Sequence, residues 1–172
     1  MREDLGAAVD YVLDGGPTQV GVESTIVDLS TGRPRLLRPG GVPRELLVTL
    51  IGGPLIDGAA EIRAPGTLPS HYAPRAAVEL VAPGEVVAVA VAHAARGTWV
   101  AALCDDEPLP PAVLRLRKPP HLEGLARDLY ALLRRADAAG VEVVVASLPP
   151  ESGLGLAIAD RLRHAAAPRP GS

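Results

Sequence analysis

A stretch rich in glycine and proline divides this chain. Residues 52–76 hold eight Gly or Pro residues and few apolar residues at any regular spacing, which is typical of an extended linker. The chain has 172 residues, enough for one ordinary domain or two small ones. We therefore predict two folded segments, residues 1–54 and 77–172, joined by a linker over residues 55–76.

Composition and charge exclude several classes of protein. There is no Phe, one Trp and three Tyr, so the core must consist of Ala, Val, Leu and Ile. Few aromatic side chains are present that could stack on nucleic-acid bases. A net charge of −3 argues against strong direct binding of nucleic acid, tRNA included. The apolar stretches are far shorter than the roughly 20 residues that cross a bilayer, and no signal-peptide pattern begins the chain. We predict a cytoplasmic protein with no membrane partner, and a single Cys leaves no disulfide or zinc site.

The first segment has the pattern of an incomplete domain. Apolar spacing predicts a helix over residues 4–14. The β-branched run 20–29, the turn residues 30–34 and the pair Leu36 and Leu37 predict a hairpin. A second helix is predicted to begin at Pro43 and end at Gly52. Because about 55 residues bury little surface alone, we expect this segment to be part of a larger domain.

The second segment alternates between strand and helix patterns. Helices are predicted over residues 122–139 and 155–166, and the near-continuous apolar run 141–147 predicts a strand buried on both faces. Four further short strands are predicted over residues 78–81, 86–92, 99–103 and 113–116. This order favours a small three-layer α/β domain with a mainly parallel sheet.

Three residues could bind ligands. On a predicted strand, the Ser24 hydroxyl could orient a small polar ligand, or simply bond to backbone or water. Arg38, followed by two glycines and a helix start, could bind an anion, or be a surface residue beside a tight turn. Tyr72 in the linker could close over a base or phosphate, or belong to a docking strip between domains. No protein metal site is predicted, and no residue is assigned a catalytic role.

Three ordered motifs resemble one enzyme family. They are GPTQVGVESTIVD at 16–28, LLRPGG at 36–41 and APGTLPSHYAP at 64–74. Together they are similar to the L-threonylcarbamoyladenylate synthase family in its long, two-domain form. Residues 129–137 and 153–162 look like the small Rossmann-like C-terminal domain of that form. The resemblance implies that residues 1–54 are the C-terminal part of a YrdC-like α/β catalytic domain.

The family resemblance implies a nucleotidyltransferase reaction. L-threonine, bicarbonate and ATP would give threonylcarbamoyl-AMP and pyrophosphate, for N6-threonylcarbamoyladenosine formation in tRNA. By the same resemblance Ser24 contacts threonine, while Arg38 and Tyr72 contact ATP. Mg²⁺ is expected on the ATP phosphates, held largely by substrate oxygens.

One departure from the family changes the expected activity. The family's Lys-x-Arg nucleotide motif and Ser-x-Asn element are absent, and residues 1–76 contain no lysine. We therefore expect a C-terminal fragment of the synthase, inactive alone because few donors remain to stabilise phosphoryl charge. The missing N-terminal part, or proteins of tRNA modification, would be its partners. The alternative is a non-catalytic α/β module that binds a ligand or regulates another protein.

Overall fold

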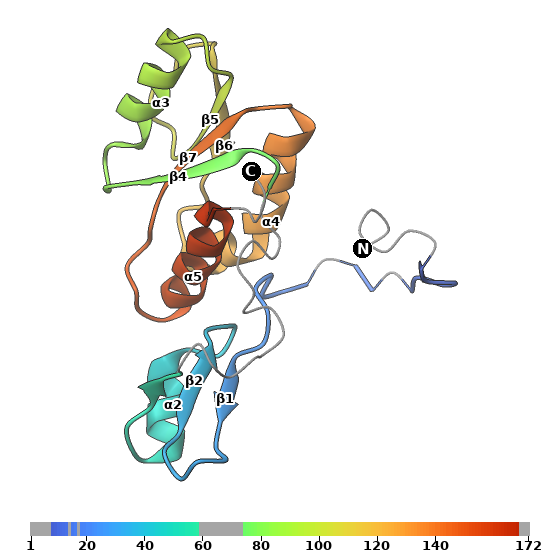
Figure 1. The fold of residues 1–172 in the computed structure, drawn as a ribbon, viewed down its shortest axis with the longest axis vertical. Helices are drawn as coiled ribbons and strands as arrows, with labels where there is room; N and C mark the ends of the chain where they lie inside the picture. The colour runs from blue at the N-terminus through green and yellow to red at the C-terminus, as the bar shows by residue number, and fades with distance from the viewer. Residues whose placement is uncertain (1–7, 14, 17, 59–73, 169–172) are drawn as a thin grey trace.

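Two units make up the structure, which is a computed structural model that describes residues 8–13, 15–16, 18–58 and 74–168. The N-terminal unit, residues 18–58, contains a three-stranded sheet and one helix. The C-terminal unit, residues 74–168, contains a four-stranded sheet and three helices. Figure 1 shows the smaller unit packed at one end of the larger, next to the end of α5 (Leu154–Ala166).

A hairpin forms the centre of the N-terminal unit. Strand β1 (Ile26–Asp28) pairs antiparallel with β2 (Arg35–Arg38), and β3 (Ile56–Asp57) adds to β2 in parallel. The turn is set locally, because the Asp28 carboxylate accepts bonds from the Ser30 hydroxyl at 2.6 Å and the Ser30 amide at 2.8 Å. These bonds, hydroxyl first, lower the pKa of Asp28. The predicted hairpin is confirmed, although β1 begins at Ile26 and not at residue 20.

Helix α2 (Arg44–Ile51) follows the hairpin and confirms the second predicted helix. Pro43, the predicted first helical residue, is instead the N-cap, so the helix begins one position later than predicted, at Arg44. Gly52 ends it with φ of 69°, and the Gly52 amide donates to the Val48 carbonyl at 3.1 Å. Glycine adopts this left-handed conformation without the steric penalty of a side chain.

The C-terminal unit is a three-layer α/β fold, as predicted. Its strands lie in the order β4-β7-β5-β6 and all three pairings are parallel. Ala101 and Leu103 of β5 pack in the core beside α4 and α5, while Val100 and Ala102 face the core beside α3. The elements are β4 (Ala77–Val81), α3 (Val86–Ala95), β5 (Val100–Cys104), β6 (Val113–Arg117), α4 (Leu122–Ala138), β7 (Val143–Ser147) and α5.

The predicted strand over residues 86–92 is wrong, because this segment is helix α3. Alternating Val and Ala resemble a strand, yet Val86 and Ala90, one helical turn apart, are the buried residues of α3. Tertiary structure decides the outcome. Strands β4 and β5 run parallel in one sheet, so the chain between them must cross back over the sheet, and a helix makes that crossover.

The predicted helix over residues 4–14 is not observed in its described part. Residues 8–13 contain no α-helix, and the side chains of Tyr11 and Leu13 are 92% and 97% exposed. A helix of this length is marginal in water without tertiary packing. Because Leu13 of the predicted apolar stripe is exposed, the described part of this segment lacks the packing that would stabilise a helix.

The structure describes only part of the predicted linker. Residues 59–73 lie outside the described residues, and Tyr72 with them. The two-residue strand β3 falls inside the predicted linker and pairs with β2. The boundaries at 54 and 77 stay predictions. Within the described residues, no helix is both long and apolar enough to span a membrane.

Candidate functional site

Two chain segments cross in the N-terminal unit and bring the predicted ligand residues together. One segment, residues 23–25, leads into β1, and the other, residues 38–42, leads out of β2. The Gly41 amide donates to the Glu23 carbonyl at 2.9 Å. The Thr25 hydroxyl donates to the Val42 carbonyl at 2.8 Å and accepts from the Val42 amide at 3.0 Å. These bonds fix the crossing.

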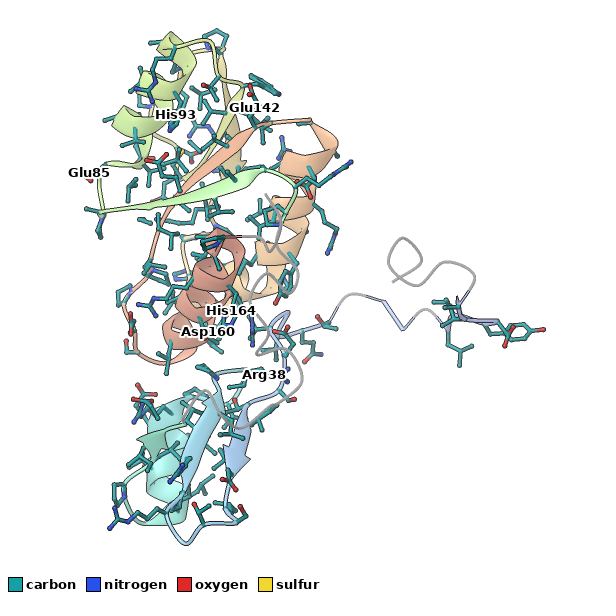
Figure 2. All side chains as sticks on the ribbon, viewed as in Figure 1. Arg38, Glu85, His93, Glu142, Asp160 and His164 are labelled. Atoms are coloured by element: carbon teal, nitrogen blue, oxygen red, sulfur yellow. The ribbon has the colours of Figure 1, made fainter. Side chains whose placement is uncertain are left out.

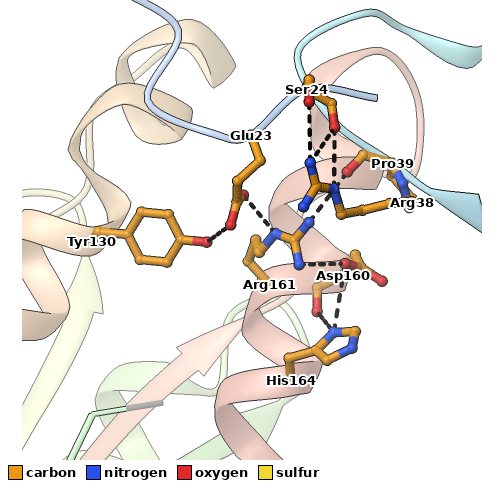
Figure 3. Close-up of polar contacts among 8 residues, drawn as sticks. All are labelled: Glu23, Ser24, Arg38, Pro39, Tyr130, Asp160, Arg161 and His164. Atoms are coloured by element: carbon orange, nitrogen blue, oxygen red, sulfur yellow. Dashed lines mark hydrogen bonds and ion pairs between the residues drawn. The ribbon is translucent and has the colours of Figure 1, made fainter. Parts of the chain in front are cut away.

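Ser24 and Arg38 meet at this crossing, although 14 residues separate them in the sequence. The Arg38 Nη2 group donates to the Ser24 hydroxyl oxygen at 3.1 Å and to the Ser24 carbonyl at 2.9 Å. Its Nε group donates to the same carbonyl at 3.1 Å. Arg38 is only 7% exposed, whereas Ser24 is exposed. A buried guanidinium therefore contacts the hydroxyl of an exposed residue (Figure 3), and Figure 2 shows Arg38 at the end of the N-terminal unit that faces α5.

Gly40 allows the two segments to approach this closely. A Cβ atom at this position would lie 2.3 Å from the Glu23 carbonyl oxygen and 2.4 Å from the Thr25 nitrogen. The sequence suggested that the glycines after Arg38 would expose amides to an anion. Instead, Gly40 serves close packing, and the Gly41 and Val42 amides bond within the crossing.

The crossing contacts helices α4 and α5 of the C-terminal unit. Gly21, with φ of 77°, packs so closely on α4 that a Cβ would lie 2.2 Å from the Arg127 Cα. The Tyr130 hydroxyl of α4 donates to Glu23 Oε1 at 3.0 Å. Arg161 Nε of α5 forms an ion pair with Glu23 Oε2 at 2.9 Å. Figure 3 shows Glu23 between these two side chains, beside Ser24 and Arg38.

Sequence reasoning missed the residues of the C-terminal unit that reach this site. Arg161 follows Ile158 by three residues and precedes Ala165 by four, so it lies within the apolar face of α5. A charge at such a position needs a partner. The arginine within the apolar stripe was therefore the sequence feature that could have indicated a buried ion pair. Glu23 carried no such signal, since its partners are more than 100 residues away.

The described residues show no protein site for a metal ion. No group of three or more His, Cys, Asp or Glu side chains among them could hold one. Glu23, the carboxylate nearest the crossing, is engaged by Tyr130 and Arg161. Lys118, the one lysine of the chain, forms an ion pair with Asp105 at 3.3 Å in the C-terminal unit.

The arrangement suits a ligand that carries negative charge and a hydrogen-bonding group. A guanidinium binds carboxylate and phosphate oxygens in a planar fork. Its burial strengthens the field at the hydroxyl of Ser24, because the surroundings of Arg38 are less polarisable than water. An amino-acid carboxylate and a nucleotide phosphate both fit this chemistry.

Comparison with known proteins gives consistent matches. A family model described as threonylcarbamoyl-AMP synthase, C-terminal domain, matches residues 42–167, and one described as telomere recombination matches residues 1–40. Threonylcarbamoyl-AMP synthase of Pyrococcus abyssi is 36% identical over an alignment of 189 residues. The alignment covers 96% of this chain and 52% of that protein. The Bacillus subtilis protein of the same name is 32% identical over 180 residues, with 98% and 52% covered.

A solved structure agrees with the sequence matches. The crystal structure of Pyrococcus abyssi Sua5 complexed with L-threonine matches with a TM-score of 0.83 at 34% identity. The match covers 96% of this chain and 52% of that one. The chain thus spans about half the length of the relatives it matches.

Proposed function

This chain belongs to the threonylcarbamoyl-AMP synthase family, and from that membership we propose that it contributes to the site where L-threonine, bicarbonate and ATP react. In the proposed reaction the amino nitrogen of threonine bonds to the carbon of bicarbonate and water leaves, which gives a carbamate. A carbamate oxygen then attacks the α-phosphorus of ATP and expels pyrophosphate, leaving threonylcarbamoyl-AMP. The product would serve N6-threonylcarbamoyladenosine formation in tRNA, and the proposed location is the cytoplasm.

One observation carries the proposal. Arg38 is 7% exposed, and its guanidinium lies 3.1 Å from the hydroxyl of the exposed Ser24. Burying a charge is costly unless partners or ligands compensate it. Bonds from Arg38 to the Ser24 carbonyl would serve a structural role, whereas the contact with the hydroxyl orients the Ser24 side chain. Ser24 would thus present a polarised hydroxyl to a ligand.

Each predicted site residue has a proposed role. Ser24 would hydrogen-bond threonine, in keeping with the L-threonine named in the Pyrococcus abyssi Sua5 structure. Arg38 would place positive charge beside the ATP phosphates, where preorganised donors stabilise charge that develops in the transition state. Tyr72, outside the described residues, would contact the nucleotide. No residue is assigned as acid, base or nucleophile.

Magnesium ion enters the proposal only with ATP. The described residues provide no carboxylate cluster for it, and Mg²⁺ usually keeps several waters and binds substrate phosphates. It would neutralise phosphate charge when bound. No step of the reaction is assigned to it through this chain.

The proposal predicts ligand binding that depends on Ser24 and Arg38. In isothermal titration calorimetry we expect heat from L-threonine and from ATP. Ser24→Ala keeps the carbonyl that Arg38 contacts but removes the hydroxyl, so threonine affinity should fall about tenfold, as for one lost hydrogen bond. Arg38→Ala should weaken ATP at least about tenfold, since charge-assisted bonds to phosphate are stronger.

Two controls make the titration decisive. Arg33→Ala removes an exposed guanidinium from the hairpin turn and should leave both affinities unchanged. Amide spectra of each variant check that the crossing still forms. No heat from either ligand with the unaltered chain would contradict the proposal and favour the non-catalytic module.

A further inference from the structure

Arg161 of α5 contacts both segments of the Ser24–Arg38 crossing. Its Nε group forms the 2.9 Å ion pair with Glu23, the residue directly before Ser24. Its Nη2 group lies 3.5 Å from the carbonyl oxygen of Pro39, the residue directly after Arg38. One side chain of the C-terminal unit therefore reaches the neighbours of both proposed ligand residues (Figure 3).

Burial makes the loss of these contacts costly. Arg161 is 4% exposed, and it and Arg38 are the two buried polar or charged residues in the part of the chain that the structure describes. Removing one partner of a buried ion pair leaves an uncompensated charge and is strongly destabilising. A guanidinium also holds two acceptors in a fixed plane, which a lysine cannot do.

Further groups set the position of Arg161 and Glu23. Asp160 Oδ2 lies 3.3 Å from Arg161 Nη1, and the His164 Nδ1 group contacts the Asp160 carbonyl at 2.8 Å. On the other side, the Tyr130 hydroxyl holds Glu23 Oε1. The carboxylate of Glu23 is thus fixed by two helices, α4 and α5. The backbone carbonyl of Glu23 accepts a hydrogen bond from the Gly41 amide.

We propose that Arg161 is a positioning residue, which fixes the Glu23–Ser24 and Arg38–Pro39 segments relative to each other and so sets the affinity of the Ser24–Arg38 site. The link to affinity rests on the proposed function. The C-terminal unit then supplies a part of the ligand site's geometry without touching the ligand. Loss of Arg161 would release both segments at once, because its two contacts flank the crossing.

Amide hydrogen exchange of the ligand-free chain tests the positioning. The Gly41 amide bonds across the crossing to Glu23, and the Val42 amide to Thr25. In Arg161→Met these two amides should exchange about tenfold faster or more. Amides of the sheet core, such as those of Ala102 and Val145, should keep their rates. A uniform rise across the C-terminal unit, or no change at Gly41 and Val42, would overturn the proposal.

Matched variants separate positioning from general damage. Arg163→Met removes an exposed arginine from the same helix, where it pairs with Glu151, and should change neither amide. Glu23→Gln keeps an oxygen for Tyr130 but weakens the ion pair, so it should reproduce the faster exchange if Arg161→Met fails to fold. Arg161→Lys retains the charge and should give an intermediate rate.

Ligand titration then distinguishes the two proposals. Arg161→Met should weaken L-threonine binding about tenfold, and Arg161→Lys should recover part of that loss. Equal threonine affinity in the unaltered chain and Arg161→Met would overturn the link between positioning and affinity. If the unaltered chain binds neither threonine nor ATP, the proposed function fails, while the exchange rates still decide whether Arg161 holds the crossing.

Discussion

Two buried arginines dominate this protein at the scale of single residues. Arg38 and Arg161 come from different units, yet both are bound at the same crossing of the chain. Arginine suits such a position because its guanidinium stays charged and satisfies several acceptors in one plane. Among the described residues, the two buried charges thus lie where ligand binding is proposed.

Gly40 gives a prediction at this scale. A methyl group there would meet backbone atoms of Glu23, Ser24 and Thr25 within 2.5 Å, and backbone cannot move aside as a flexible side chain can. Gly40→Ala should lower the free energy of unfolding by about 1–3 kcal/mol, as overpacking does. Urea denaturation, followed by the amide signals of residues 41 and 42, measures it.

The control for this substitution lies in the same unit. Gly53 has open space around the position of a Cβ atom and no positive φ, so Gly53→Ala should be neutral or slightly stabilising. Equal effects of the two substitutions would show that the close approach at Gly40 does not hold the crossing together.

At the scale of elements, helix α3 shows how a pattern can mislead. The run of alternating Val and Ala at 86–92 fits a strand on periodicity and residue type, yet it forms a helix against β5 and β7. A helix buries residues four apart, as Val86 and Ala90 are. The other strands of the C-terminal unit are correctly predicted because each is short, rich in Val, Leu or Ala, and bounded by loop residues.

The helical form of α3 predicts unequal costs for two similar substitutions. Val86 is 6% exposed and Val91 is 38% exposed. Val86→Ala should cost about 1.5 kcal/mol or more of unfolding free energy through lost apolar burial. Val91→Ala should stay within about 0.5 kcal/mol, helped by the higher helix propensity of Ala. Thermal or urea unfolding compares them, and a larger cost at Val91 would contradict the assignment of this face.

At the scale of the whole molecule, a few polar contacts join the two units. Besides those of Glu23, the Glu45 carboxylate of α2 accepts from the Gly153 amide at 3.2 Å, where Gly153 is the N-cap of α5. A carboxylate near a helix N-terminus is favourably placed relative to the helix dipole. The proposed ligand site therefore lies where the two units meet.

The contact between Glu45 and Gly153 should depend on pH. The pKa of Glu45 is lowered from 4.5, first by its own backbone amide and then by that of Gly153. A carboxyl group with a lowered folded pKa favours the native contact above its unfolded pKa, and that contribution is lost as pH falls through the folded value. We expect Gly153 amide exchange, corrected for its intrinsic pH dependence, to lose protection as pH falls from 4.5.

Glu45→Gln provides the comparison for the pH series. Its neutral side chain does not titrate, so the Gly153 amide should show the same corrected protection throughout the acidic range. If the unaltered chain and Glu45→Gln follow the same curve, another group is responsible for any change in the junction.

Local chemistry was sufficient to predict much of this protein. The hairpin turn at 30–34, the end of α2 at Gly52, the helices α4 and α5 and the parallel sheet follow from turn residues, caps and periodicity, because these act between near neighbours. The motifs also singled out Ser24 and Arg38. Only tertiary structure determined that α3 is a helix, that residues 8–13 are not, and that Arg161 reaches Glu23. Those outcomes depend on surfaces contributed by residues far away in the chain, and no local pattern records such partners.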